Sequence, residues 1–482
     1  MLKSSFHWPA RIRRNALIKE AIRGFERREV VTGAAGGGNT MAFGSGAGAA
    51  GRNGVGGVWI AGRIIGILDG GFVLQDESGR VDVFFELAVS AGDIVEVKIS
   101  AEKRVGEDGV VYNVFTAIDL RVLAKCADDY FIKKSDPNWK KTVVDLKLKE
   151  GLKVRSEILK KTREFFWGAG FTETETPEMV KLPGMEPYLD PFKSRLMTQA
   201  YEGLPAEEFD TYLITSPEYA MKKLLVSGWE KIFQISKSFR NRETDGSLHN
   251  PEFTLLEWYR AYDDYRGIMK DMEGLVNHLA KEICGGDDVV FGDYRVDTSL
   301  PWPRKKVAEL FEEYADIDRE TLTDRDGLFA AVVKKGYKLA QNAPYEDLFY
   351  TVFMNEIEPK LGILKPVIVY DYPLQMAALA KKSEDDPRYA ERFEVYIGGV
   401  ELCNAFTELN DPVEQEARLK DESAYRKKLG KENYPVDQSF IGALKFGMPP
   451  AGGNALGMDR LAMILTNTAD IRDMILFPLR DL

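Results

Sequence analysis

Cysteine and histidine are scarce in this chain, which has three of each among its 482 residues. Cys126, Cys284 and Cys403 lie far apart and form neither a disulfide framework nor a zinc-binding set, which predicts a reducing, cytoplasmic environment. With so few histidines, a zinc cluster or a histidine relay is not expected. No apolar run of about 18 residues occurs, so no membrane-spanning helix is expected. No apolar segment follows the basic N-terminus, which argues against a signal peptide.

The sequence also lacks a P-loop lysine motif and an excess of positive charge. Its formal net charge is −11, so any contact with nucleic acid must come from a local patch. Hydrophobic residues make up 44% of the chain and charged residues 29%, which is typical of an ordinary soluble enzyme. The length predicts about two or three domains with a large core.

The most informative segment is SKSFRNRETDGSLHNPEFTLLEWY, residues 236–259. Its polar middle, with Gly246, predicts a turn between two strands. In the second strand Phe253, Leu255, Glu257 and Tyr259 occupy every second position and share one face. Because an unpaired buried carboxylate is costly, Glu257 between aromatic residues indicates a pocket for a cation. A hairpin with solvated charges is the alternative.

Two further segments, residues 170–179 and 452–465, belong with residues 236–259 as a set of three sequence motifs. In GGNALGMDRLAMIL (452–465), small residues let the backbone approach a ligand and Arg460 opens an apolar helix. Together with GFTETETPEM (170–179) and the segment above, it resembles the three ordered motifs of class II aminoacyl-tRNA synthetases, over about residues 150–482. TSPEYAMKKLL (215–225) and ERFEVYIGGVELCNAFTEL (391–409) are similar to the lysine-activating branch of that class.

The resemblance implies an α+β fold in which helices flank an antiparallel sheet, a homodimer, and the formation of an aminoacyl-adenylate from ATP. It places Arg240 at the α-phosphate and the amino-acid carboxylate, and Arg460 at the γ-phosphate, as the catalytic pair. Adenine would lie between Phe253 and Arg460, because aromatic and guanidinium groups stack on bases. His249 would contact the phosphate tail and Glu243 the nucleotide. Glu243 lies one position later than in standard lysyl-tRNA synthetases.

The resemblance also implies an amino-acid pocket and a metal site. A buried ε-ammonium group requires carboxylates and a hydroxyl as partners. Glu394 and Glu401 would bind Mg²⁺, which prefers oxygen ligands and phosphates, although two such glutamates also fit an exposed surface. The implied amino-acid-binding residues are Glu218, Arg240, Glu257, Tyr259, Asn404, Phe406, Glu408 and Ala455.

Several positions are closer to the lysine ligases that modify elongation factor P. Ser216, EPYLDPF (186–192), YPLQMAALA (372–380) and Ala455 follow that branch, and the Ala455 methyl group would favour a differently shaped substrate such as β-lysine. The acceptor is therefore open between tRNA, which we favour narrowly, and elongation factor P. A non-catalytic paralogue that binds RNA or a partner protein is the third alternative.

Residues 58–124 contain short alternating strands separated by turns and resemble an OB-fold, the anticodon-binding domain of related synthetases. Phe72 would stack on an anticodon base, and Arg63 would hold a phosphate or a base. Asp82 stands where the family usually has glutamine, and a carboxylate cannot donate a hydrogen bond. A purely structural barrel is the alternative, and the retained barrel is our reason for favouring tRNA.

The remaining segments set the predicted domain boundaries. Residues 1–57 combine a basic amphipathic helix, which would contact RNA or pack as a solvated or dimer helix, with a Gly/Ala-rich linker. Residues 125–150 are a charged connector and 151–482 the catalytic domain. Within it, about 265–345 is predicted as a helical insertion.

Overall fold

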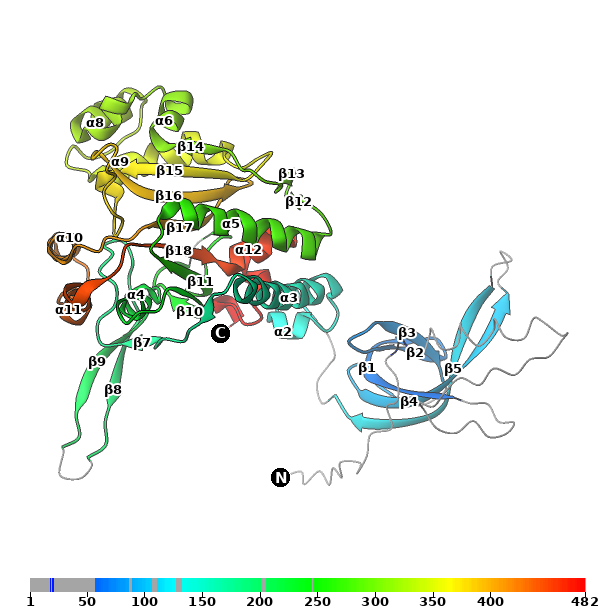
Figure 1. Ribbon diagram of the computed structural model, residues 1–482. Helices are drawn as coiled ribbons and strands as arrows, with labels where there is room; N and C mark the ends of the chain where they lie inside the picture. The colour runs from blue at the N-terminus through cyan, green and yellow to red at the C-terminus, as the bar shows by residue number, and fades with distance from the viewer. Residues whose placement is uncertain are drawn as a thin grey trace, which may run out of the picture. The chain divides into compact units, whose positions relative to one another are not determined.

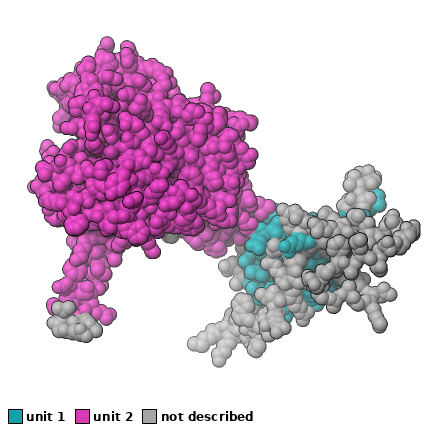
Figure 2. Space-filling model, in the orientation of Figure 1, with its two compact units in different colours: residues 1–136 teal, residues 137–482 magenta. Residues whose placement is uncertain are grey.

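The computed structural model describes residues 18, 20, 57–85, 89–105, 111–126, 132–200, 205–244 and 246–481. The chain divides into two compact units, residues 1–136 and 137–482 (Figure 2). The predicted basic helix and Gly/Ala-rich linker lie outside the described residues, apart from Ile18, Glu20 and Gly57.

The first unit contains a closed five-stranded barrel (Figure 1), which confirms the predicted OB-fold. The strands follow the order β1-β2-β3-β5-β4, and antiparallel pairing of β1 with β4 closes the barrel. They are β1 (Val58–Leu68), β2 (Gly71–Gln75), β3 (Arg80–Phe84), β4 (Ile94–Val105) and β5 (Val111–Ala124).

The strand alternation directs Phe72 into the barrel. Phe72 and Leu74 on β2 are fully buried, as is Val83 on the neighbouring β3. Ile18 packs in the same cluster, and its backbone N–H donates a hydrogen bond of 2.9 Å to Asp76. The prediction that Phe72 stacks on a nucleic-acid base is therefore wrong, because its ring fills the core and offers no free face.

We expect Phe72→Ala to destabilise the barrel rather than remove a base contact. Truncating a fully buried phenylalanine costs about 3–5 kcal/mol, from lost burial and the cavity left behind. Hydrogen exchange of the β1–β5 amides in the full-length protein measures this loss. Phe84→Ala is the matched control, since Phe84 is 41% exposed and its truncation should leave exchange nearly unchanged. Equal exchange in Phe72→Ala and the parent protein would contradict the placement of this ring.

The other barrel residues singled out in the sequence lie at its surface. The Arg63 guanidinium group donates a hydrogen bond of 2.7 Å to the carbonyl of Gly92, so it ties β1 to the turn before β4. Asp82 is exposed on the outer face of β3, between Arg80 and Phe84. Phe84, which the sequence analysis missed, thus presents an exposed aromatic ring where Phe72 does not.

The second unit is built on an eight-stranded sheet of order β14-β15-β16-β17-β18-β11-β10-β6 (Figure 1). Its neighbours are antiparallel except at the two edges, where β14 pairs with β15 and β6 with β10 in parallel, so the predicted antiparallel sheet is confirmed. The strands are β6 (Thr172–Glu173), β10 (Lys231–Phe239), β11 (Glu252–Ala261), β14 (Arg304–Lys306), β15 (Val367–Pro373), β16 (Tyr389–Ile397), β17 (Val400–Thr407) and β18 (Ala451–Gly457).

Two smaller sheets accompany the large one. The first has the order β7-β9-β8, and β8 and β9 project from the unit as a hairpin (Figure 1). The second is the two-stranded pair β12-β13. Their strands are β7 (Met179–Val180), β8 (Lys193–Met197), β9 (Glu208–Leu213), β12 (Asp288–Phe291) and β13 (Tyr294–Asp297).

Three helices cover one face of the large sheet and form its main core. They are α3 (Leu146–Gly168), α5 (Tyr265–Leu279) and α12 (Met458–Leu465), whose buried residues join those of β11, β17 and β18 in one cluster. Helix α5 belongs to this core, so residues 265–345 are not a separate helical insertion, and they also supply β12, β13 and β14.

Several other helices pack on the large sheet through two further clusters of buried apolar residues. Helices α6, α8 and α9 pack with β15 and β16 in a second cluster, and α4 packs with α11 in a third. No helix of the described ranges is long and apolar enough to cross a membrane. The bounds are α2 (Asn138–Lys141), α4 (Glu218–Val226), α6 (Val307–Ala315), α7 (Arg319–Thr323), α8 (Arg325–Lys334), α9 (Tyr345–Val352), α10 (Pro412–Lys428) and α11 (Gln438–Gly447). Two short π-helices are η1 (Ala280–Cys284) and η2 (Phe353–Ile357), and four short 3₁₀-helices are η3 (Glu358–Lys360), η4 (Leu374–Met376), η5 (Ile471–Met474) and η6 (Leu479–Asp481).

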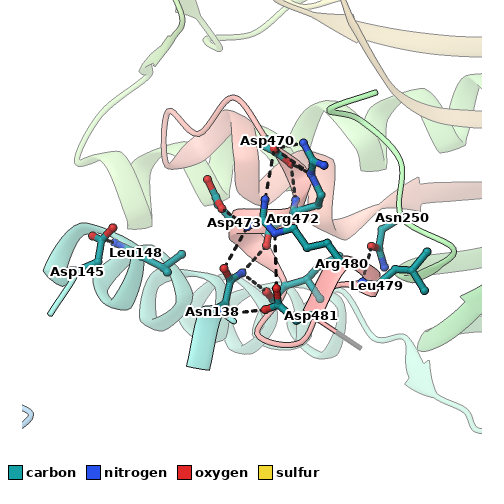
Figure 3. Close-up of polar contacts among 11 residues, drawn as sticks. Asn138, Asp145, Leu148, Asn250, Asp470, Arg472, Asp473, Leu479, Arg480 and Asp481 are labelled. Atoms are coloured by element: carbon teal, nitrogen blue, oxygen red, sulfur yellow. Dashed lines mark hydrogen bonds and ion pairs between the residues drawn. The ribbon is translucent and has the colours of Figure 1, made fainter. Parts of the chain in front are cut away.

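The C-terminal segment is tied to both α2 and the β10–β11 loop (Figure 3). The Asn138 side chain donates hydrogen bonds to the carbonyls of Arg472 (2.7 Å) and Ile475 (2.9 Å). The backbone N–H of Leu479 donates to the Asn250 side chain at 3.2 Å. These contacts brace the loop residue that follows His249.

Candidate active site

The sheet face opposite α3, α5 and α12 carries a cavity of about 560 Å³. Its lining includes both arginines singled out in the sequence, Arg240 at the end of β10 and Arg460 near the start of α12. It also includes Glu257 and Glu408, so the two guanidinium groups and the acidic residues share one space.

Strand register brings the polar residues of this cavity into rows. Glu257 on β11 pairs with Ala455 on β18, which pairs with Asn404 on β17, which pairs with Glu394 on β16. Residues directly opposite each other in neighbouring strands point to the same face of a sheet. Four predicted site residues, scattered over about 200 positions of the chain, therefore form one line across the cavity floor.

A second row of paired residues lies beside the first, two positions away from Glu257, Ala455 and Asn404 on their strands. Tyr259 pairs with Gly453, and Gly453 pairs with Phe406. A side chain at Gly453 would collide with the Glu408 carboxylate, since a Cβ atom there would lie 2.1 Å from its Oε1. Glycine at this position therefore leaves room for Glu408 to reach into the cavity.

One end of the cavity is acidic. The Tyr259 hydroxyl donates a hydrogen bond of 3.0 Å to Glu257 Oε2, whereas Glu257 Oε1 is buried with no hydrogen-bond partner among the described residues. Glu408 is 1% exposed and Glu218, the first residue of α4, borders the same space. A buried carboxylate oxygen without a donor is costly unless a ligand supplies one.

Burial makes these carboxyl groups hard to ionise in the empty cavity. Desolvation, with repulsion from Glu218, raises the pKa of Glu257 well above its ordinary value. Desolvation likewise raises the pKa of Glu408 to about 8, although Lys222 opposes this shift. An ammonium ligand would reverse both shifts, because a cation favours the ionised carboxylates.

We therefore expect lysine to bind more tightly as the pH rises from about 6 to about 8. Below the raised pKa values of Glu257 and Glu408 the empty pocket holds protons that an ammonium ligand must displace, so affinity increases by up to about tenfold per pH unit for each proton displaced. Calorimetry at about pH 7 in two buffers of different ionisation enthalpy should show release of at least about one proton, with a second expected if Glu257 also ionises on binding. Equal heats in both buffers would contradict this coupling.

The other end of the cavity is basic and aromatic. The Arg240 guanidinium group lies 5.0 Å from the centre of the Phe253 ring, and its buried Nε has no hydrogen-bond partner among the described residues. Glu243 Oε1 is 3.8 Å from Arg240 Nη1. An arginine whose nitrogen has no partner within the protein can donate hydrogen bonds to a carboxylate or a phosphate of a ligand.

Arg460 is oriented by three groups. Its Nη1 donates to the carbonyl of Glu401 at 3.0 Å, its Nε donates to the carbonyl of Leu248 at 3.3 Å, and its Nη2 lies 3.0 Å from Nε2 of His249. Burial and the neighbouring Arg460 cation lower the pKa of His249. His249 therefore stays neutral and accepts from the guanidinium group.

The two predicted metal ligands differ in their surroundings. Glu394 is 4% exposed and accepts from Arg392 Nη2 (2.7 Å) and from the hydroxyls of Tyr372 (2.6 Å) and Tyr396 (2.5 Å). The Glu401 side chain is 38% exposed. Both line the cavity, but no group of three His, Cys, Asp or Glu side chains in the described ranges is arranged to hold a metal ion alone.

Comparison with known proteins assigns this architecture to a family. A family model described as tRNA synthetases class II (D, K and N) matches residues 137–481. The chain belongs to this family. Two similar proteins are the lysine–tRNA ligases of Pelotomaculum thermopropionicum, 36% identical, and of Magnetococcus marinus, 34% identical. The matches cover 88% and 87% of this chain and 86% of each relative, so they extend beyond the second unit.

The synthetase cavity gathers every ATP-, amino-acid- and metal-binding residue expected from the sequence, whereas Arg63 and Phe72 lie in the first unit. Sequence reasoning missed Arg392, whose Nε donates to the Asn404 side chain at 3.0 Å. It also missed Lys222, which is fully buried beside Glu218 and Glu408. The signal for Lys222 was its position four residues after Glu218, which places both on one helix face.

Proposed function

We propose that this class II synthetase activates lysine with ATP and transfers the lysyl group to tRNA. The observation that carries the proposal is the convergence of Arg240 and Arg460 with Glu257 and Glu408 in one cavity. The basic end suits the triphosphate and the amino-acid carboxylate, and the acidic end suits an amine. The lysine–tRNA ligases among the relatives support the same substrates.

In the proposed reaction the lysine carboxylate attacks the α-phosphate of ATP, the bond to the β-phosphate breaks, and pyrophosphate leaves. Arg240 holds the attacking carboxylate and the α-phosphate, while Arg460 holds the far end of the triphosphate. Phe253 supports the adenine ring. The ε-ammonium group donates to Glu257, Glu408 and the Tyr259 oxygen, and Glu218 binds the α-amino group. Such catalysis depends mainly on positioning and charge stabilisation.

We propose that Glu394 and Glu401 hold Mg²⁺ together with the phosphates. Magnesium needs only one or two protein carboxylates when phosphate oxygens complete its coordination, so the absence of a three-residue cluster among the described residues fits this assignment. The ion neutralises phosphate charge when it is bound. Arg392, Tyr372 and Tyr396 orient Glu394 by donating to its two oxygens.

The barrel and the similar proteins both favour tRNA as the acceptor of the lysyl group. Both relatives named above are lysine–tRNA ligases and match this chain beyond the catalytic unit, which favours tRNA over elongation factor P. Phe84 is the ring we propose for stacking on a base, because it is 41% exposed on the outer face of β3 and aromatic faces stack on any base.

The lysine isomer depends on Ala455, whose methyl group lies between Glu257 and Asn404 in the cross-strand row. β-Lysine remains the alternative substrate, since a methyl group at this point changes the room near the amino-acid backbone. If crowding at Ala455 sets the preference, Ala455→Gly should improve activation of α-lysine relative to β-lysine. Unchanged relative rates would exclude this explanation.

The proposed function is tested by ATP–pyrophosphate exchange with α- and β-lysine, followed by transfer of radiolabelled lysine with tRNA and elongation factor P offered together. We expect lysine-dependent exchange and labelled tRNA. Label on elongation factor P alone would reassign the acceptor. No exchange with either isomer would leave a non-catalytic RNA- or protein-binding paralogue as the interpretation.

We also propose that the protein is a homodimer. Trp139 on α2 and Trp167 on α3 are 52% and 53% exposed, and Phe477 in the C-terminal segment is 56% exposed. Large exposed apolar side chains of this kind mark interaction surfaces. Sedimentation velocity should give a dimer that Trp167→Glu weakens, and a concentration-independent monomer would contradict the proposal.

A further inference from the structure

A lysine of the chain itself, Lys222, lies buried behind the acidic end of the cavity, against two of the carboxylates that line it. Lys222 occupies the second turn of α4, and its side chain is 0% exposed. Its Nζ lies 2.5 Å from Glu218 Oε1 and 2.5 Å from Glu408 Oε2. The same nitrogen is 5.2 Å from the centre of the Phe406 ring. The ammonium group therefore contacts three residues that we assign to substrate binding.

Helix geometry and the sheet together place Lys222 there. Met221, Lys222 and Leu225 are the buried residues of α4, so Lys222 is on the inward face of the helix. Glu408 reaches it from the end of β17, which lies far away in sequence. A buried ammonium group is stable only with such partners, and the two carboxylates raise the pKa of Lys222 although burial alone would lower it.

Counting charges shows what Lys222 does to the pocket. Glu218, Glu257 and Glu408 carry three negative charges when ionised, and Lys222 offsets one of them. The remaining two match the α- and ε-ammonium groups of lysine, whose carboxylate is left to Arg240. A fourth carboxyl group, Glu186, also lines the cavity, but burial and repulsion from Glu218 raise its pKa and so favour its neutral form, against the attraction of Arg240 and Arg426.

We propose that Lys222 is a positioning residue of the amino-acid pocket, which holds Glu218 and Glu408 together and leaves the charge that selects a substrate with two ammonium groups. This inference rests on the proposed function. Without the ammonium group the two carboxylates repel each other, and Glu408 loses the cation that opposes its raised pKa, so it holds a proton more readily instead of binding the substrate.

Lys222→Met tests the proposal, because methionine fills a similar volume without charge. In lysine-dependent exchange we expect the KM for lysine to rise by about tenfold to a hundredfold, as for loss of a buried ion pair, with the KM for ATP within about twofold of the parent value. Lys222→Arg should recover part of the loss. The pH at which lysine affinity increases should shift upward in Lys222→Met, because its carboxyl groups lose a neighbouring cation.

Lys223→Met is the matched control, since Lys223 pairs with Asp437 (3.4 Å) and Ser439 (2.8 Å) outside the cavity. An unchanged lysine KM and pH profile in folded Lys222→Met would overturn the proposal, as would an equal rise in the KM values for lysine and ATP. If Lys222→Met does not fold, Lys222→Gln takes its place, and a lysine KM within about twofold of the parent value would likewise overturn it. Absence of exchange in the parent protein would instead refute the proposed function.

Discussion

Replacing Arg460 with alanine is expected to lower kcat/KM for ATP in lysine-dependent exchange by about 10²–10³-fold, the usual cost of removing one preorganised donor from a charged transition state. The guanidinium group is already oriented by the carbonyls of Leu248 and Glu401. Its reorganisation during the reaction should therefore cost little free energy. Arg460→Lys should remain strongly impaired, because an ammonium group lacks the planar fork that binds phosphate at two points.

Arg242→Ala provides the control for this experiment. Arg242 lies in the same β10–β11 loop as His249, but its side chain is 80% exposed and its contact with Asp190 is 3.7 Å long. Its removal should change kcat/KM by less than about twofold, as for other exposed ion pairs. If Arg460→Ala kept a third or more of the parent activity, Arg460 would have no role in ATP activation.

Glu257→Gln should impair the use of lysine about as strongly as Arg460→Ala impairs the use of ATP. It should not reduce the stability of the empty protein. We expect kcat/KM for lysine to fall by about 10²–10³-fold, because the buried ammonium group would lose a charged partner. The empty protein should melt at the same or a higher temperature, since a carboxyl group that burial prevents from ionising, with one unpaired oxygen, is replaced by a neutral amide.

Exchange kinetics and thermal melting measured on the same preparation separate these two effects. Glu252→Gln is the matched control on the same strand, because Glu252 is 53% exposed, pairs with Lys237 and lies outside the cavity. A lower melting temperature for Glu257→Gln would show that the carboxylate stabilises the fold. That outcome, or unchanged lysine kinetics, would refute the pocket assignment.

Much of the candidate site could be predicted from the sequence because strand periodicity is a local property. Alternation in residues 253–259 put Phe253, Glu257 and Tyr259 on one face, and β11 has that geometry. The same reasoning placed Asn404 and Phe406 together on β17. The resemblance to class II synthetases then supplied the partners on other strands, and the register confirms their alignment in rows.

The barrel shows where local reasoning fails. The five strands were predictable from alternation and turns, but a resemblance alone cannot tell which residue of a Gly71–Phe72 pair points outward. A shift of one residue moves every side chain of a strand to the other face. In the folded barrel Phe72 is buried and Phe84 is exposed, so the aromatic ring available at the surface comes from β3.

The sequence by itself determined which residues of the cavity strands β11 and β17 share a face, the three motifs, and the spacing that puts Glu218 and Lys222 on one side of a helix. Only the tertiary structure decided that Glu408, 186 positions after Lys222, comes within 2.5 Å of its ammonium group. Periodicity reports which residues share a face, because it depends on backbone geometry. The partner of a buried charge depends on which distant elements pack against that face, and packing is a property of the whole fold.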